Sequence, residues 1–225
     1  MNVWAIVPVK PLNRAKSRLA GVLAPEVREQ LATAMLTRTV SLLAESPDIS
    51  GTLVISRDSR ALVIARRYGA KTVQESGNPE LNPSLERASQ VIASWNAGAA
   101  LVLPADLPLL ALADLKELVN LGRYNQSAVI VPDRLGDGTN GLLLRPPGLI
   151  SFSFGPHSFA RHLASARAAN ATVHVYRSER LTLDLDVPED LLIYLELCPK
   201  YHVEPLIEFD VADLLPFVTA QEEKT

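Results

Sequence analysis

One cysteine and no large excess of either charge are the first features of this sequence of 225 residues. Cys198 has no second thiol to pair with, so an internal disulfide is excluded, and no cysteine–histidine spacing of the zinc type is present. The formal net charge is -3, so the protein as a whole is not drawn to nucleic acid or to an anionic membrane. Any basic binding site must therefore be local.

Long uninterrupted hydrophobic segments are also missing. Residues 3–9 are apolar but too few for the core of a signal peptide, and no basic residue precedes them. The apolar stretches on either side of Asp106 are broken by that charge, so neither is expected to span a membrane. Together with the single thiol, this predicts a soluble protein of the cytoplasm, with neither nucleic acid nor membrane as a partner.

The composition fits one globular domain. Apolar residues make up 48% of the chain, which is ordinary for a buried core, and the length suits a single domain over residues 1–225. No repeat, low-complexity tract or long linker divides it. Short apolar segments alternate with helical patterns, which indicates an α/β fold of three α/β/α layers around a mainly parallel sheet.

The individual elements follow from the period of the apolar residues. We expect Asn82 to cap the helix that begins at residue 83. The predicted strands are 3–9, 51–56, 71–73, 99–103, 128–131, 141–144, 172–176 and 181–185. The predicted helices are 25–45, 59–68, 83–96, 112–121, 157–169, 188–197 and, less clearly bounded, 211–218.

A basic loop follows the first predicted strand. Lys10, Arg14, Lys16 and Arg18 place four positive charges within nine residues, and no acidic residue appears before Glu26. A triphosphate needs several nearby cations, and arginine can grip two phosphate oxygens at once. The loop is not a P-loop, because the required glycines are absent. A solvated basic loop or a subunit contact remains an alternative.

Three aspartates follow predicted strands or lie within one. Asp106 comes directly after an apolar strand, while Asp184 and Asp186 would point to one side of a strand, with Leu185 in the core. Two carboxylates about 4 Å apart repel by roughly 4 kcal/mol at an effective dielectric near 20, so such a pair needs a cation or a shared proton. Oxygen ligands without histidine favour Mg²⁺ or Mn²⁺. The alternative is that Asp106 and Asp186 cap helices.

Two further loops suit a small anionic ligand. The loop at 137–141 offers Thr139 and Asn140 as hydrogen-bond donors. The segment from Gly155 to Ser158 precedes a helical pattern, whose first backbone N–H groups attract anions. A small phosphorylated acid would fit such a site. Ordinary turn and capping chemistry is the alternative, and His157 is expected to be a loop residue rather than a base.

Five segments together resemble a known family. They are VPVKPLNRAKSRL from Val7, LPADLP from Leu103, GTNG from Gly138, FGPHSF from Phe154 and LDLDVP from Leu183. They are similar to the phosphoenolpyruvate and 2-phospho-L-lactate guanylyltransferases, which make an activated precursor of the deazaflavin coenzyme F-420. The resemblance runs to about Cys198, and the aspartate motifs are shared with a wider MobA-like nucleotidyltransferase superfamily.

The resemblance implies a Rossmann-like nucleotide half at 1–110, an acceptor half at 111–200 and a tail at 201–225. It implies GTP as donor, phosphoenolpyruvate or 2-phospho-L-lactate as acceptor, pyrophosphate as product and Mg²⁺, or Mn²⁺, as cofactor. The family's site residues correspond here to catalytic Lys10, Arg14, Lys16 and Arg18; nucleotide-binding Pro8, Val9, Lys10, Asn82 and Pro104; acceptor-binding Thr139, Asn140, Gly155 and Ser158; and metal-binding Asp106, Asp184 and Asp186.

Other functions stay open at this point. A nucleotide-sugar glycosyltransferase also uses a D-x-D metal site on an α/β sheet. Another MobA-like nucleotidyltransferase, such as one acting on molybdopterin, and a catalytically silent nucleotide-binding protein are further options. The tail after Cys198 suits either a homodimer contact or a helix on its own domain.

Overall fold

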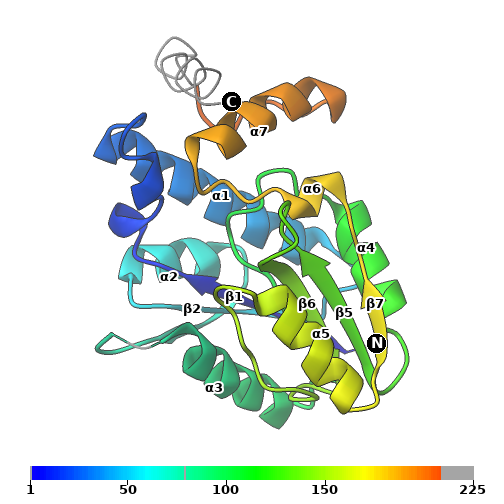
Figure 1. Ribbon diagram of the computed structural model, residues 1–225. Helices are drawn as coiled ribbons and strands as arrows, with labels where there is room; N and C mark the ends of the chain where they lie inside the picture. Colours follow the sequence, from blue (N-terminus) through cyan, green and yellow to red (C-terminus); the bar gives the residue numbers. More distant parts are fainter. Residues whose placement is uncertain (1, 79, 209–225) are drawn as a thin grey trace.

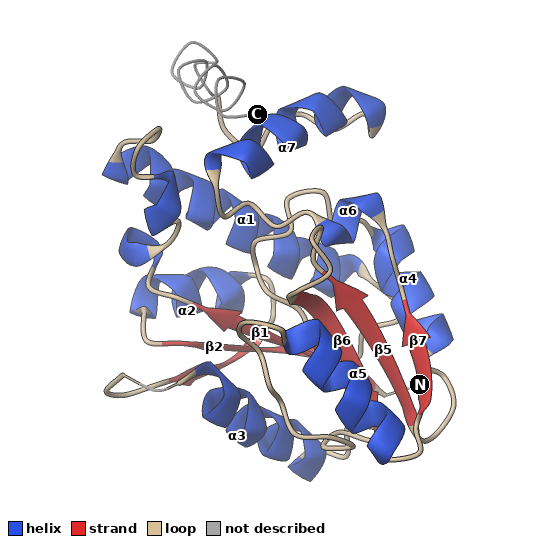
Figure 2. Ribbon diagram, viewed as in Figure 1, coloured by secondary structure: helices blue, strands red, loops and turns tan. Residues whose placement is uncertain are grey.

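The apolar segments pair edge to edge into one mixed sheet of seven strands, in the order β3-β2-β1-β4-β6-β5-β7 (Figures 1 and 2). The computed structural model describes residues 2–78 and 80–208. Only β6 runs against its neighbours; the other adjacent pairs are parallel. The strands are β1 Val3–Val9, β2 Gly51–Ser56, β3 Lys71–Gln74, β4 Ala99–Val102, β5 Ser127–Pro132, β6 Thr139–Arg145 and β7 Thr172–Val175.

Helices cover both faces of the sheet, because successive residues of each buried strand point to opposite faces. Buried residues of α1, α2 and α4 pack with those of one face, and buried residues of α3 and α5 pack with those of the other. The helices are α1 Pro25–Glu45, α2 Ser59–Arg67, α3 Leu81–Ser94, α4 Leu112–Leu121, α5 Ser158–Ala168, α6 Glu179–Thr182 and α7 Pro188–Lys200, with two short 3-10 turns, η1 Leu12–Arg14 and η2 Ser17–Leu19.

The predicted α/β class with a mainly parallel sheet is confirmed, and one predicted strand is wrong. Residues 181–185 do not join the sheet; they form the end of α6 and an extended segment without strand partners. Leu181, Leu183 and Leu185 are nevertheless buried, so the alternation of apolar residues is real. An extended segment can therefore bury alternate side chains in the core without pairing with a neighbouring strand. Among the described helices, none is long and apolar enough to cross a membrane.

The cap predicted at Asn82 is also wrong. α3 begins at Leu81, so Asn82 lies inside its first turn and its side chain is used elsewhere. After α7 the chain continues along its own domain, where Leu206 N donates to Tyr194 Oη at 2.9 Å. The helix predicted at 211–218 lies outside the described residues.

A buried carboxylate anchors the segment that leads to the second and third aspartates. Asp114, at the start of α4, is fully buried and accepts from Arg180 Nε at 2.7 Å and Arg180 Nη2 at 2.8 Å. It also accepts from Ser178 Oγ at 3.0 Å and Tyr176 Oη at 3.2 Å. All three partners precede or begin α6. Asp114 therefore fixes where the following extended segment starts.

Replacing Asp114 tests this anchor. We expect Asp114→Asn to lower the free energy of unfolding by about 3 kcal/mol, because it leaves Arg180 without its counter-charge. The value is at the low end for a buried ion pair, since the Arg180 side chain is 25% exposed. Urea unfolding followed by circular dichroism measures it, with Asp48→Asn, in the turn after α1, as the control. Equal unfolding midpoints for both variants would contradict the anchoring role.

Candidate functional site

A cavity of about 480 Å³ opens at the carboxyl edge of the sheet, where β1 and β4 end. The chain runs from β1 to β2 on one side, while β4 lies on the other side of β1. Such a change of direction is where open α/β sheets bind ligands. Eight residues predicted from the sequence line this cavity: Pro8, Val9, Lys10, Arg14, Lys16, Pro104, Asp106 and Asp186.

The basic loop is held over the cavity by a lysine in an uncommon backbone conformation. Lys16, between η1 and η2, has a left-handed φ of 55°. This conformation costs a residue with a side chain on the order of 1 kcal/mol. Lys16 Nζ lies 2.9 Å from Asp106 Oδ2, and the lysine side chain is only 7% exposed. The sheltered ion pair offsets the backbone strain and fixes the loop against the β4 turn.

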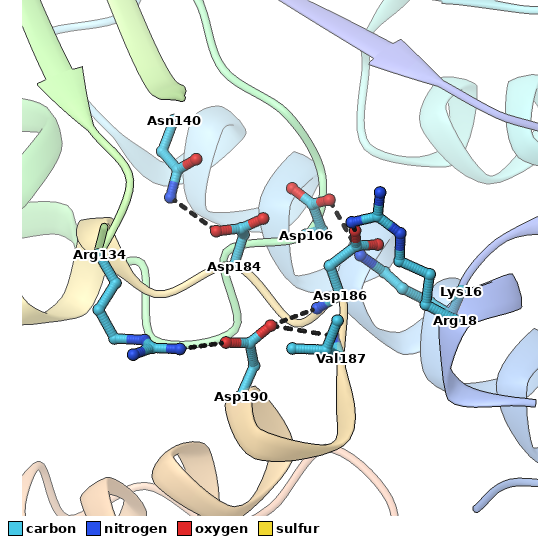
Figure 3. A network of polar contacts seen from close by, with 9 residues as sticks. All are labelled: Lys16, Arg18, Asp106, Arg134, Asn140, Asp184, Asp186, Val187 and Asp190. Carbon is cyan, nitrogen blue, oxygen red and sulfur yellow. Dashed lines mark hydrogen bonds and ion pairs between the residues drawn. The ribbon is translucent and has the colours of Figure 1, made fainter. Parts of the chain in front are cut away.

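Arg18 makes a second ion pair of a different kind. Its Nη1 lies 2.9 Å from Asp186 Oδ2 (Figure 3), but the two side chains are 71% and 40% exposed. An exposed pair of this type contributes little to stability. Among the described residues, Lys10 and Arg14 have no ion pair. Their charges are available to a ligand in the cavity, and that of Arg18 is easily released.

The D-x-D segment is extended and tied to the turn after β4. Leu185 N donates to Asp106 O at 3.1 Å, and the Leu185 side chain is fully buried between the two aspartates. Asn140 Nδ2 donates to Asp184 Oδ1 at 3.1 Å. Burial, and next the charge of Asp106, raises the pKa of Asp184 to about 6. The geometry thus brings Asp106, Asp184 and Asp186 near one another (Figure 3), and Asp106 and Asp186 line the cavity.

Both capping alternatives for the aspartates are wrong. Asp190, not Asp186, caps α7: its Oδ2 accepts from Asp186 N at 3.0 Å and Val187 N at 2.9 Å. Its other oxygen accepts from Arg134 Nη2 at 3.1 Å (Figure 3). Asp106 does not cap α4 either, because that helix is capped from within its own first turn. The carboxylates of Asp106 and Asp186 are therefore not used to begin a helix.

The three aspartates fit a site for a divalent cation in their chemistry. They offer only oxygen, which Mg²⁺ and Mn²⁺ prefer, and the pKa of Asp184 is raised first by burial and then by the negative charge of Asp106. Within the described ranges, no three acidic, histidine or cysteine side chains already have metal-binding geometry. Lys16 and Arg18 hold two of the carboxylates instead. The metal assignment stays a prediction.

The two loops predicted to hold an acceptor lie together. Asp137 O accepts from Phe159 N at 3.0 Å, and Asp137 Oδ2 accepts from His157 N at 3.0 Å. Gly155 has a φ of 120°, which a residue with a side chain adopts only with strain. Ser158 is the first residue of α5 and is 1% exposed. The loop after β5 and the start of α5 therefore form one unit.

A buried histidine that the sequence reasoning left without a role joins this unit to β6. Ser153 N donates to His162 Nε2 at 3.0 Å, so the ring proton is on Nδ1. Nδ1 lies 3.0 Å from Thr139 Oγ1 and donates to it. Because His162 follows Ser158 by one helical turn, the two share a face of α5. This spacing of four residues from Ser158 was the only feature of the sequence that could have indicated a structural role for His162.

Asn82 does not line the cavity. Its Oδ1 accepts from Phe154 N at 2.7 Å and its Nδ2 donates to Phe154 O at 3.0 Å, so it fastens the loop before α5 to α3. Residues that the sequence reasoning missed line the cavity instead, among them Arg57 and Glu75. Arg57 and Glu75 follow the ends of β2 and β3, and that position could have singled them out.

The α/β fold of this chain is one that a solved nucleotidyltransferase also has. A solved cytidylyltransferase from Leptospira borgpetersenii superposes with a TM-score of 0.57 at 17% identity, covering 99% of this chain and 96% of that chain. At that identity the likeness concerns the fold alone.

Sequence similarity places the chain more narrowly. The family described as "Guanylyl transferase CofC like" matches residues 3–200, and the chain belongs to this family. A phosphoenolpyruvate guanylyltransferase of Rubrobacter xylanophilus is 44% identical over 191 residues, which are 85% of this chain and 92% of that protein. A 2-phospho-L-lactate guanylyltransferase of Methanothermobacter thermautotrophicus is 38% identical over 191 residues, 85% of this chain and 83% of that protein. The resemblance seen in the sequence motifs is confirmed.

The buried histidine gives a dependence of stability on pH. Burial, helped by the charge of Arg161, lowers the pKa of His162 from an ordinary 6.5 to about 4. The unfolded chain therefore binds a proton before the folded one does. The stability that the neutral ring gives is complete above pH 6.5 and is lost as the pH falls toward 4.

We expect wild type to lose about 2 kcal/mol more unfolding free energy than His162→Gln between about pH 7.5 and pH 5. Urea unfolding at several pH values measures this difference, and His174→Gln, on the edge strand β7, is the matched control. If His162→Gln and wild type lose stability in parallel, the imidazole is not held neutral.

Proposed function

We propose that this protein transfers GMP from GTP to a small phosphorylated three-carbon acid, phosphoenolpyruvate or 2-phospho-L-lactate, and releases pyrophosphate. The observation that carries the proposal is the juxtaposition of Lys10 and Arg14, which have no ion pair among the described residues, with neighbouring carboxylates and with the start of β6, where Asn140 donates to Asp184. Membership of the guanylyltransferase family and relatives named for both acids support it. The product would be the activated precursor expected in coenzyme F-420 synthesis.

The donor triphosphate lies over the carboxyl ends of β1 and β4 in this proposal. Lys10 and Arg14 line the cavity there and have no ion pair within the described residues. Arg14 can hold two phosphate oxygens, and Lys10 supplies a point charge. These side chains neutralise the negative charge that would otherwise repel an anionic nucleophile, and they stabilise the departing pyrophosphate.

Asp106, Asp184 and Asp186 hold Mg²⁺ in this proposal, with Mn²⁺ as a substitute. A bound divalent ion of this kind supplies positive charge to phosphate oxygens. Asn140 Nδ2 and the backbone bond from Leu185 orient Asp184 and the β4 turn for that task. When the nucleotide binds, Lys16 would leave Asp106 for the phosphates, and Asp106 would then be free to hold the metal.

The acceptor binds beside Thr139, Gly155 and Ser158 in this proposal, where the hydroxyl groups of Thr139 and Ser158 can donate to its acid group. One of its phosphate oxygens attacks the α-phosphorus of GTP. The new P–O bond forms as the bond to the β-phosphate oxygen breaks, and that oxygen leaves with pyrophosphate. A phosphate monoester is largely ionised near neutral pH, with a second pKa near about 6, so no side chain needs to remove a proton.

A small matrix of substrates tests this function. We expect pyrophosphate release from GTP only with a phosphorylated three-carbon acid and only with Mg²⁺ or Mn²⁺, with the product mass equal to the acid plus GMP. The double variant Asp106→Asn, Asp186→Asn should reduce kcat/KM by at least roughly 100-fold, because two charge-bearing ligands are lost. Turnover without metal, or an undiminished double variant, would refute the metal scheme. Release of GDP from a GDP-sugar offered in the same matrix would instead indicate a glycosyltransferase.

Lys16, which now pairs with Asp106, gives a prediction in which metal affinity and turnover change in opposite directions. Lys16→Met removes the competing charge from Asp106, so nucleotide-free Mn²⁺ affinity should rise by roughly tenfold, as expected for a sheltered charge at short range. Turnover should fall, because the triphosphate loses a cation. Electron paramagnetic resonance of free Mn²⁺ measures the affinity, and Lys116→Met, on the exposed side of α4, is the control. Weaker Mn²⁺ binding in Lys16→Met would disprove the competition.

A further inference from the structure

We propose that Glu75 reads the base of the donor nucleotide and makes the site selective for guanine. This inference rests on the proposed function, because it concerns the same cavity. Glu75 lines the cavity together with Ile55 and Arg57, at the end away from the D-x-D segment. No sequence motif pointed to this side chain.

The order of the strands sets the distance between the two ends of the cavity. Along the carboxyl edge, Pro104 and Asp106 follow β4, Lys10 follows β1, Arg57 follows β2 and Glu75 follows β3. Neighbouring strands lie about 4.8 Å apart, so Glu75 is two strand spacings, roughly 10 Å, from the end of β1. That is about the reach of a nucleotide from its α-phosphate to its base. With the phosphates at β1 and β4, the base falls beside β3.

Glu75 is the carboxylate at that end, and its surroundings hold it in place. Its backbone N donates to Ser56 O at 3.0 Å, which continues the pairing of β3 with β2. Arg87 Nη2 lies 3.4 Å from Glu75 Oε1 and donates to Ser84 Oγ at 3.0 Å. The Glu75 side chain is 16% exposed. Arg87 therefore steadies one oxygen from the side of α3, and the carboxylate keeps lone pairs for a ligand.

The chemistry of a carboxylate singles out guanine among the four bases. Guanine presents the N1–H and the 2-amino group side by side, and a carboxylate accepts from two adjacent donors at once. Adenine and cytosine place a ring acceptor next to their amino group, and uracil places its N–H between two carbonyls. The carboxylate of Glu75 would face an acceptor lone pair in each of those bases, which disfavours them. Ile55 and Leu81 supply apolar walls for the flat ring.

Inosine triphosphate is the sharpest probe, because it lacks only the 2-amino group. We expect wild type to bind GTP roughly 10–100-fold more tightly than inosine triphosphate in calorimetry, the range for a hydrogen bond to a charged group. In Glu75→Gln the two affinities should come within about threefold of each other, because the amide has only one acceptor oxygen. A GTP preference that persists in Glu75→Gln would overturn the proposal.

Two more variants make the result specific. Glu80→Gln, an exposed carboxylate just before α3 that does not line the cavity, should keep the wild-type preference. Glu75→Asp keeps the charge beside Arg87 but draws it back by one methylene, so it should give an intermediate preference even if Glu75→Gln folds poorly. A full GTP preference in Glu75→Asp together with Glu75→Gln would also overturn the role.

The binding measurement separates this inference from the proposed function. If no acceptor yields pyrophosphate while GTP still binds better than inosine triphosphate through Glu75, the transferase proposal fails and the base-reading role stands. If pyrophosphate is released but the preference is independent of Glu75, the reverse holds.

Discussion

The site depends on one electrostatic constraint: carboxylates from the β4 turn and the D-x-D segment are brought together where water cannot fully screen them. Asp184 is the most sheltered of them, and its raised pKa is the direct consequence. The buried side chain of Lys16 neutralises part of this negative charge, because its Nζ lies 2.9 Å from Asp106 Oδ2. The conformation of the basic loop, including the strained backbone of Lys16, follows from that contact.

Two other carboxylates serve as structural supports. Asp114 accepts hydrogen bonds from the side chains of Ser178 and Arg180, at the start of α6. Asp190 accepts hydrogen bonds from the backbone N–H groups of Asp186 and Val187. The D-x-D segment is thus held at both ends, although it has no strand beside it. A segment fixed by charged hydrogen bonds at its ends, with an apolar residue between, keeps its direction without a sheet ladder.

Periodicity along the chain predicted most of the fold. The strands through β7 and the helices α1 to α5 and α7 appear close to where their apolar residues placed them, and α1 begins and ends as expected, whereas the short helix α6 was not predicted. The D-x-D segment was mistaken for a strand because alternation reports which side is buried, not whether a neighbour is present. The links within the site could not be foreseen. Asn82 with Phe154, Asn140 with Asp184 and His162 with Thr139 join residues 72, 44 and 23 positions apart.

The reversed direction of β6 has a consequence for how this architecture can diversify. The parallel strands β1 to β4 reach the cavity edge of the sheet with their last residues. The antiparallel strand β6 reaches the same edge with its first residues, Thr139 and Asn140. In the proposed function, the two substrates are therefore bound by segments that lie in separate stretches of the chain and reach this edge from opposite directions. Insertions or exchanges in the hairpin before β6 can alter the acid that is accepted while the nucleotide half keeps its sequence.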